Sequence, residues 1–168
     1  MNILNKLDEK DHAILNILQR NARTTNTDIA EKIGLSTAST LERVRKLKKM
    51  GITKSHHTKL DPHKLSLTTS SIVQIRLHSI KKENIAIFKR AIDEISEVIE
   101  CYQVTGETDF FLKIVTTDIT AYQQLLVEKL STIEPVKCIR SAVILTTLKE
   151  NGLLPIPNAY AKRSIGGK

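Results

Sequence analysis

Apolar residues recur at helical spacing in two short stretches near the start of the chain. The first follows Asp8, a suitable N-cap with Asp11 at the third helical position, and its apolar face consists of Leu7, Ile14, Leu15 and Leu18. The second follows Thr25, has Asp28 three residues later as in a capping box, and stops at Gly34. This pattern predicts two short helices.

A third helical stretch follows Ser36 and stops at Gly51. Its inward stripe consists of Leu41, Val44 and Leu47. Only a three-residue turn separates it from the preceding helix, and the spacing Ala30-x3-Gly34 would let two helices cross closely. Together with the first helix as a support, this arrangement predicts a helix-turn-helix.

The segment ITKSHHTKLDP, residues 52–62, predicts a small two-stranded wing that ends at Asp61–Pro62. We therefore place a winged helix-turn-helix domain at residues 1–55 and a wing or linker strand at 56–66.

From residue 67 the pattern changes to alternating strands and helices. SSIVQIRLH alternates as a strand with one buried face, made of Val73, Ile75 and Leu77. The runs that follow are a helix at 82–96, strands at 98–104 and 109–115 separated by a glycine-containing turn, a helix at 121–133 and an extended run at 136–148.

The order β-α-β-β-α-β predicts a ferredoxin-like split βαβ fold, so the chain is expected to be an α+β protein with a second domain at 67–150. Helices cover one face of such a sheet, and a second copy of the chain is the simplest cover for the other face. The remaining residues, 151–168, form a tail that is expected to be mobile from Asn158 onward.

Charge is distributed unevenly between these parts. The chain has a net charge of +8, and residues 1–66 carry 13 Lys and Arg against 7 Asp and Glu, whereas residues 67–150 are near neutral. A basic N-terminal part joined to a near-neutral part suggests that the N-terminal part binds a polyanion. Aromatic residues make up only 4% with no Trp, which argues against stacking platforms for single-stranded nucleic acid.

The basic third helix suggests contact with DNA. If its stripe faces inward, Ser36, Ser39, Thr40, Arg43 and Lys46 face outward, with Arg45, Lys48 and Lys49 on the flanks. We expect Arg43 and Ser39 to contact bases. The other residues of the set are expected to bind the phosphate backbone of the DNA or to lie close to the duplex. The complete set of expected DNA contacts is Ser36, Thr37, Ser39, Thr40, Arg43, Lys46, Lys48, Lys49 and Lys54. The alternative is a solvated basic helix without a partner.

Four segments carry a resemblance to a known family: LDEKDHAILNILQRNART, DIAEKIGLSTASTLERVRKLKKMGI, LDPHKL and VTGETDFFLKI. They resemble the Lrp/AsnC family of transcriptional regulators, and the resemblance extends from about Leu7 to Glu150. Family members often carry Pro in the first turn of the recognition helix, where this chain has residues 37–40, and their turn usually reads Gly-Asp-Tyr/Phe-Asp, where this chain has Gly106–Asp109.

The resemblance implies a winged helix-turn-helix followed by a ferredoxin-like "regulation of amino-acid metabolism" (RAM) domain. It also implies dimers formed through the sheets, octamers in some members, and an amino-acid effector bound between subunits. The residues expected to bind that effector are those of the glycine turn, Thr105, Gly106, Glu107, Thr108 and Asp109. The turn residues alone permit a second interpretation, in which Gly106 serves the turn and Asp109 caps it.

Other kinds of chemistry find little support in the sequence. His56 and His57 are adjacent and would point to opposite faces of a strand, so no metal site is predicted. No phosphate loop or nucleophile elbow is present, so we expect neither an enzyme nor a cofactor. Cys101 and Cys138 are expected to be buried, small apolar residues. The sequence shows no leader and no membrane-length apolar run, which predicts a cytoplasmic, nucleoid-associated protein.

These observations lead to three functional hypotheses. The first is a sequence-specific transcriptional regulator of duplex DNA, acting as a dimer or larger assembly and modulated by an amino acid. The second is an architectural DNA-binding protein with little sequence preference. The third is an amino-acid-binding module or small enzyme that does not bind DNA. The basic charge of residues 1–66 argues against this third hypothesis.

Overall fold

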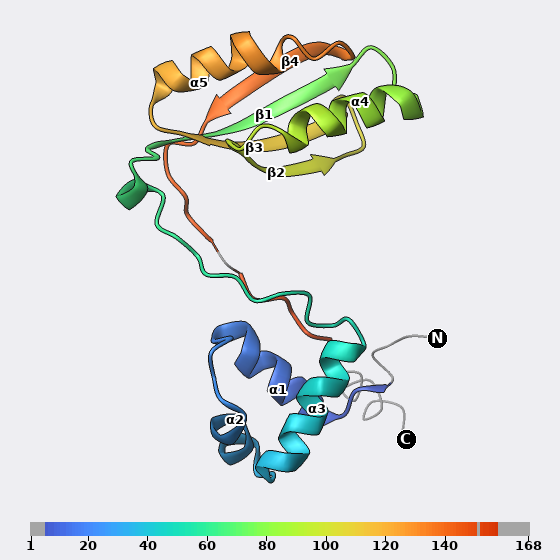
Figure 1. Cartoon of the computed structure of the whole chain (residues 1–168), viewed down its shortest axis with the longest axis vertical. Coiled ribbons are helices and arrows are strands. Elements are labelled where there is room, and N and C mark those ends of the chain that lie inside the picture. Colours follow the sequence, from blue (N-terminus) through green and yellow to red (C-terminus); the bar gives the residue numbers. More distant parts are fainter. Residues whose placement is uncertain (1–5, 151, 158–168) are drawn as a thin grey trace, which may run out of the picture. The chain divides into compact units, whose positions relative to one another are not determined.

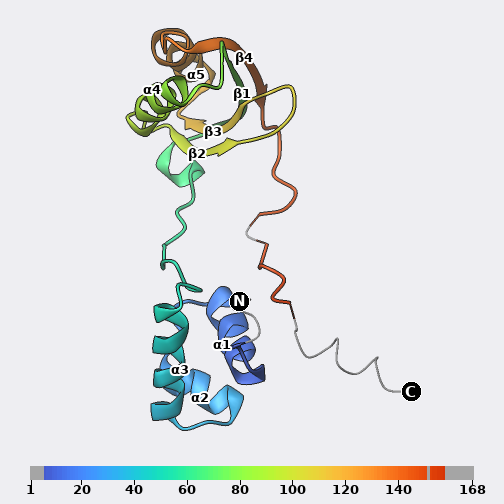
Figure 2. The ribbon, with the colours of Figure 1, turned by 90° about the vertical axis from the view of Figure 1, so that its right-hand side faces the viewer.

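The computed structural model describes residues 6–150 and 152–157, which fall into two compact units (Figures 1 and 2). The helical domain contains the residues up to Thr58 together with the segment that begins at Lys149, and the sheet domain comprises Lys59–Leu148.

Three helices form the helical domain: α1 spans Glu9–Arg20, α2 spans Asn26–Ile33 and α3 spans Thr37–Lys49. The predicted N-caps are present: Thr25 and Asp28 form the expected capping box at the start of α2, and Asp8 and Asp11 form one at the start of α1. Gly34 ends α2 with φ = +66°, a left-handed conformation that glycine adopts without strain. A Cβ on Gly34 would come no closer than 3.9 Å to another residue, so this glycine serves the turn and not the close helix crossing expected from Ala30-x3-Gly34.

Apolar faces of all three helices meet in a common core. Its buried residues are Leu7, Ile14, Leu15, Ile29, Ile33 and Leu47. Part of the C-terminal segment joins them, because Ile156 packs against this cluster. The Leu154 backbone N–H also donates to Gln19 Oε1 at 2.8 Å, and Gln19 Nε2 donates to the Leu154 carbonyl at 3.4 Å. The tail residues expected to be mobile, from Asn158 onward, lie outside the described residues.

The predicted two-stranded wing is wrong. Between Gly51 and Pro62 the structure contains neither helix nor strand, and a short 3-10 turn at His63–Leu65 follows. The segment has few apolar residues to bury one face of a hairpin, and Leu60 is 63% exposed. These residues therefore form an extended connection between the two domains.

The sheet domain has the predicted element order. Its elements are β1 at Thr69–Leu77, α4 at Lys82–Asp93, β2 at Val98–Gln103, β3 at Phe110–Thr116, α5 at Ile119–Leu125 continuing into a π-helical turn at Leu126–Leu130, and β4 at Val136–Val143. The strands form one antiparallel sheet in the order β2-β3-β1-β4, which is the ferredoxin-like arrangement. The last strand, β4, is shorter than the predicted run of 136–148. Leu145 and Leu148, which lie beyond it, are almost fully exposed.

Both helices of the sheet domain pack on one face of the sheet (Figure 2). Val73, Ile75 and Leu77 of β1 point toward them, as the alternation predicted, and are buried with Leu112 of β3. Phe88 of α4 stacks at a tilt on Phe110 of β3, with ring centroids 4.6 Å apart.

The opposite face of the sheet, called the open face below, has no helix over it in the sheet domain. It is lined by residues that alternate with the core positions: Ile72, Gln74, Arg76, Glu100, Tyr102, Phe111, Lys113, Cys138, Arg140 and Ala142. The prediction of buried cysteines is wrong, since Cys101 and Cys138 are both exposed. They lie on β2 and β4, the two edge strands, where cover is least.

Candidate functional site

The inward side of α3 differs from the predicted one by part of a turn. Thr40 is completely buried and Leu47 is too, whereas Leu41 is only half-buried. The prediction that Thr40 faces outward is therefore wrong. Successive residues of a helix lie about 100° apart around its axis. Because Thr40 is buried more deeply than its neighbour Leu41, the exposed side of α3 is rotated about the helix axis from its predicted position.

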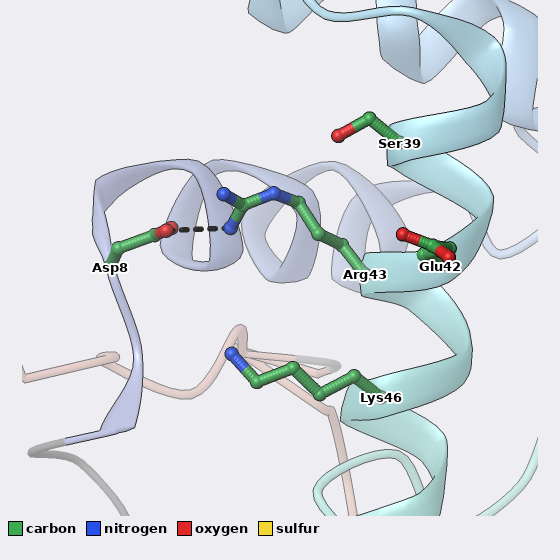
Figure 3. A pocket seen from close by; sticks show the side chains of 5 residues that line it. All are labelled: Asp8, Ser39, Glu42, Arg43 and Lys46. Atoms are coloured by element: carbon green, nitrogen blue, oxygen red, sulfur yellow. Dashed lines mark hydrogen bonds and ion pairs between the residues drawn. The ribbon is translucent and has the colours of Figure 1, made fainter.

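Arg43 does not point outward as predicted. Its Nη1 donates to Asp8 Oδ2 at 2.6 Å and to Asp11 Oδ1 at 2.8 Å, at the N-terminal end of α1 (Figure 3). Lys46, one turn later, places its Nζ 3.0 Å from Asp11 Oδ2. The two aspartates are the capping-box residues of α1, so the same carboxylates that begin α1 also hold α3.

The electrostatics of this cluster favour its charged form. Partial burial acts to raise the pKa of the Asp8 carboxyl, but hydrogen bonds from the Asp11 backbone N–H and from Arg43 outweigh it, so the pKa lies below its usual value. Hydrogen bonds from Arg43 to Asp8 and Asp11 likewise raise the pKa of the guanidinium. Because the Asp11 side chain is 0% exposed, its charge needs both cations.

A shallow hollow of about 430 Å³ adjoins this cluster. It is lined by Asp8, Ser39, Glu42, Arg43 and Lys46, and Figure 3 shows Arg43 and Lys46 both extending to the same side of α3. The cations lining it are therefore already engaged with carboxylates.

The most exposed side of α3 carries a different set of residues. Ala38, Glu42, Arg45 and Lys49 recur at intervals of four, three and four residues and all are exposed. Neither Arg45 nor Lys49 forms a hydrogen bond or ion pair with any residue in the described part of the chain, and Lys48 on the flank is also unpaired there. The sequence pattern predicts Arg45 on a flank of the helix and outside the expected DNA contacts. Recognising Thr40 as a buried position would have brought Arg45 to the exposed side.

The remaining expected DNA contacts lie at the two ends of this surface. Ser36 and Thr37 are exposed at the start of α3, where the Ser36 Oγ accepts from the Ser39 backbone N–H at 3.2 Å. Lys54 is exposed in the extended connection after α3.

The glycine turn of the sheet domain connects β2 to β3 with Gly106 at φ = +116°. Asp109 has a structural contact: its Oδ2 accepts from the Leu77 backbone N–H at 2.7 Å, beside the register shift of β1 between Arg76 and Leu77. Thr105 and Glu107 are exposed, and Thr108 is half-buried.

A hollow of about 240 Å³ joins this turn to the open face. Its lining residues are Gln74, Arg76, Glu107, Thr108, Lys137, Cys138 and Arg140. Antiparallel pairing creates it, since Gln74 lies opposite Arg140 and Arg76 lies opposite Cys138. The expected effector residues Glu107 and Thr108 thus share a pocket with three cations that the sequence pattern does not reveal, Arg76, Lys137 and Arg140.

Comparison with known families identifies both halves of the chain. The winged helix-turn-helix DNA-binding family matches residues 7–52, and the Lrp/AsnC ligand binding domain matches residues 70–154. The chain belongs to the Lrp/AsnC family.

Other members of the Lrp/AsnC family match nearly the whole chain. The transcriptional regulator AzlB of Bacillus subtilis is 33% identical over 89% of this chain and 96% of its own length. The leucine-responsive regulatory protein of Escherichia coli is 33% identical over 89% of this chain and 92% of its own length.

Solved structures of family members have the same fold. A Neisseria meningitidis transcriptional regulator in complex with L-Met has a TM-score of 0.85 at 29% identity, covering 89% of this chain and 97% of its own. Escherichia coli AsnC has a TM-score of 0.80 at 27% identity, covering 90% and 99%. The α+β architecture predicted for this Lrp/AsnC chain, a helix-turn-helix followed by a ferredoxin-like domain, is confirmed.

Within 6–150 and 152–157, no helix has the length and apolar character needed to cross a bilayer. In the same ranges, no three His, Cys, Asp or Glu side chains gather as metal ligands.

Proposed function

We propose that this chain is a transcriptional regulator that binds duplex DNA sequence-specifically through α3 and responds to a free amino acid. The observation that carries the proposal is the exposed side of α3, where Arg45, Lys48 and Lys49 are unpaired among the described residues. Cations without carboxylate partners are free to replace the counterions of phosphates. A helix held by two others, after a three-residue turn, has the geometry of a major-groove reader.

A single helix of this kind supports only weak binding, so two copies are needed. The open face supports dimer formation because it exposes apolar area, including Tyr102 at 54% exposure, which is paired with the half-buried Phe111 of β3. Two chains paired through these faces would present two α3 helices to one duplex. The binding site should then be nearly palindromic.

The pocket beside the glycine turn supports the amino-acid response. Arg76, Lys137 and Arg140 suit a carboxylate, and Glu107 suits an ammonium group, so the pocket carries both charges that a free amino acid needs. Related proteins are named for leucine or crystallised with L-Met. A ligand bound here would act by favouring one assembly of subunits over another.

Selection of bound fragments from genomic DNA, with and without each of the twenty amino acids, tests the proposal. We expect fragments that share a two-fold half-site pattern, an affinity that falls steeply with salt, and a change in binding with at least one amino acid. Uniform coverage without a shared pattern would indicate an architectural protein, and no binding in dilute buffer would leave an amino-acid-binding module.

The dimer is tested by replacing a central residue of the open face. Phe111→Asp should convert the dimer to a monomer in sedimentation, because each chain would bury an unpaired carboxylate in the interface. Val127→Asp is the matched control, since Val127 is 62% exposed on the π-helical turn away from the open face. A Phe111→Asp protein that remains dimeric would exclude pairing through this face.

A further inference from the structure

We infer that bases are read by the stripe Ala38–Glu42–Arg45 of α3, and that Arg43 is a positioning residue that turns this stripe outward. The inference rests on the proposed DNA-binding function. It differs from the sequence-based expectation, in which Arg43 and Ser39 read the bases.

The rotation of α3 about its own axis is fixed from two directions. On one side Thr40 and Leu47 are fully buried in the domain. On the adjoining side Arg43 bridges Asp8 and Asp11, and Lys46 contacts Asp11. Because the Asp11 carboxylate is entirely buried, releasing Arg43 toward DNA would leave a buried charge with one cation fewer. Arg43 is therefore held at α1.

The stripe that remains exposed has a spacing suited to consecutive base pairs. Ala38 and Arg45 are seven residues apart, or roughly 10 Å along a helix axis at ~1.5 Å per residue. That span corresponds to about three base-pair steps of ~3.4 Å. Ala38 lies in the first turn of α3, the end of a recognition helix that approaches base edges, and Arg45 lies two residues past the middle of the helix, where its long side chain extends the reach of the stripe.

The side chains of the stripe also match specific base edges. Arg45 has the fork that binds guanine O6 and N7, and Glu42 is an acceptor for the cytosine N4 amino group. Ala38 offers a methyl group that fits beside a thymine methyl. Lys49, one further turn along, has the reach and charge for a phosphate.

Glu42 strengthens the argument because it is a single acid on a basic surface. It forms no ion pair with a described residue and is exposed. A carboxylate near phosphates weakens binding to every sequence, except where it accepts a hydrogen bond from a base. Its presence on the exposed stripe therefore indicates discrimination between sequences.

The test measures base preference by selection from a random duplex library with the full-length protein and its variants. Arg45→Ala should relax preference at one guanine position in each half-site by about tenfold or more, and Glu42→Gln should shift preference from cytosine toward adenine at one position. Lys49→Gln is the control on the same stripe: it should weaken binding to all sequences and lower the salt slope by about 0.9. All three residues are exposed, so helical circular dichroism should be unchanged.

Arg43→Lys provides the decisive comparison, since it keeps the positive charge. It should leave the base preferred at every position unchanged. The inference is overturned if Arg45→Ala lowers affinity uniformly with a reduced salt slope, or if Arg43→Lys changes the preferred base while Arg45→Ala does not. If the proposed DNA-binding function is wrong, the selection gives a different result, because the unaltered protein would then enrich no motif at all.

Discussion

On the side of α3 that lies against α1, Arg43 and Lys46 both end on aspartates, whereas on the exposed side Arg45, Lys48 and Lys49 end on no described residue. The two sides contain the same residue types within one short helix. What separates them is the capping box of α1, which supplies carboxylates to one side only. A basic helix is thus not a uniformly basic surface, and counting its cations overstates the charge available to DNA.

The two sets of cations are expected to act on different free energies. Those facing α1 contribute to the stability of the helical domain, because they compensate a buried carboxylate. Those facing solvent contribute little to folding and are available for phosphates. Replacing residues on the two sides should separate stability from DNA affinity.

The largest difference should appear when Arg43 and Arg45 are compared. Arg43→Ala leaves the fully buried Asp11 carboxylate with Lys46 alone, and should lower the free energy of unfolding of the helical domain by about 3 kcal/mol. Arg45→Ala should change it by less than about 0.5 kcal/mol. Urea unfolding followed by helical circular dichroism measures both changes. Equal changes would mean that the two sides of α3 do not differ in their contribution to stability.

Thr40 tests whether the buried side is correctly placed. Its hydroxyl is buried and has no hydrogen-bond partner among the described residues. Thr40→Val should therefore raise the unfolding free energy by about 1 kcal/mol and leave DNA affinity unchanged. If Thr40→Val instead loses specific DNA affinity while its unfolding free energy is unchanged, Thr40 contacts DNA.

The salt dependence of binding distinguishes Lys46 from Lys48. Lys48→Gln should lower the slope of log K against log salt by about 0.9, the amount for one phosphate contact. Lys46→Gln should lower it by less, because the Lys46 ammonium already contacts Asp11. Titrations at several salt concentrations give both slopes, and a greater effect at Lys46 would mean that DNA displaces the carboxylate.

The smallest effect concerns pH. The folded-state pKa of Asp8 is lowered below its ordinary value of 3.8, so the carboxyl contributes to stability above that value and loses the contribution as the pH falls through its lowered pKa. Asp8→Asn keeps a capping side chain. The difference in unfolding free energy between the two proteins should be constant from about pH 5 to 8 and shrink below about pH 4. A difference that grows with acid would contradict this.

Local chemistry made the helix boundaries predictable. Asp8 with Asp11, and Thr25 with Asp28, lie three residues apart, so the capping contacts follow from the sequence alone. The order of strands and helices was likewise evident from alternation and spacing. The rotation of α3 was not, because it depends on contacts of Arg43 with residues 32 and 35 positions away.

The pocket of the sheet domain shows the same limit. Gly106 marks a turn in the sequence, and that turn was found. Arg76 and Arg140 belong to strands far apart in the chain, and only the pairing of β1 with β4 brings them together. A pattern that reports one strand at a time cannot show which side chains meet across two.

The contact of Leu154 with Gln19, and of Ile156 with the helical core, has a consequence for how the protein is built. The helical domain is discontinuous in sequence: residues 59–148 are, in topological terms, an insertion between its two parts. The chain therefore passes between the domains twice: the segment before β1 continues from α3, and the segment after β4 joins the helical domain through the non-covalent contacts of Leu154 and Ile156. A fragment ending after Thr58 would accordingly lack a piece of its own hydrophobic core.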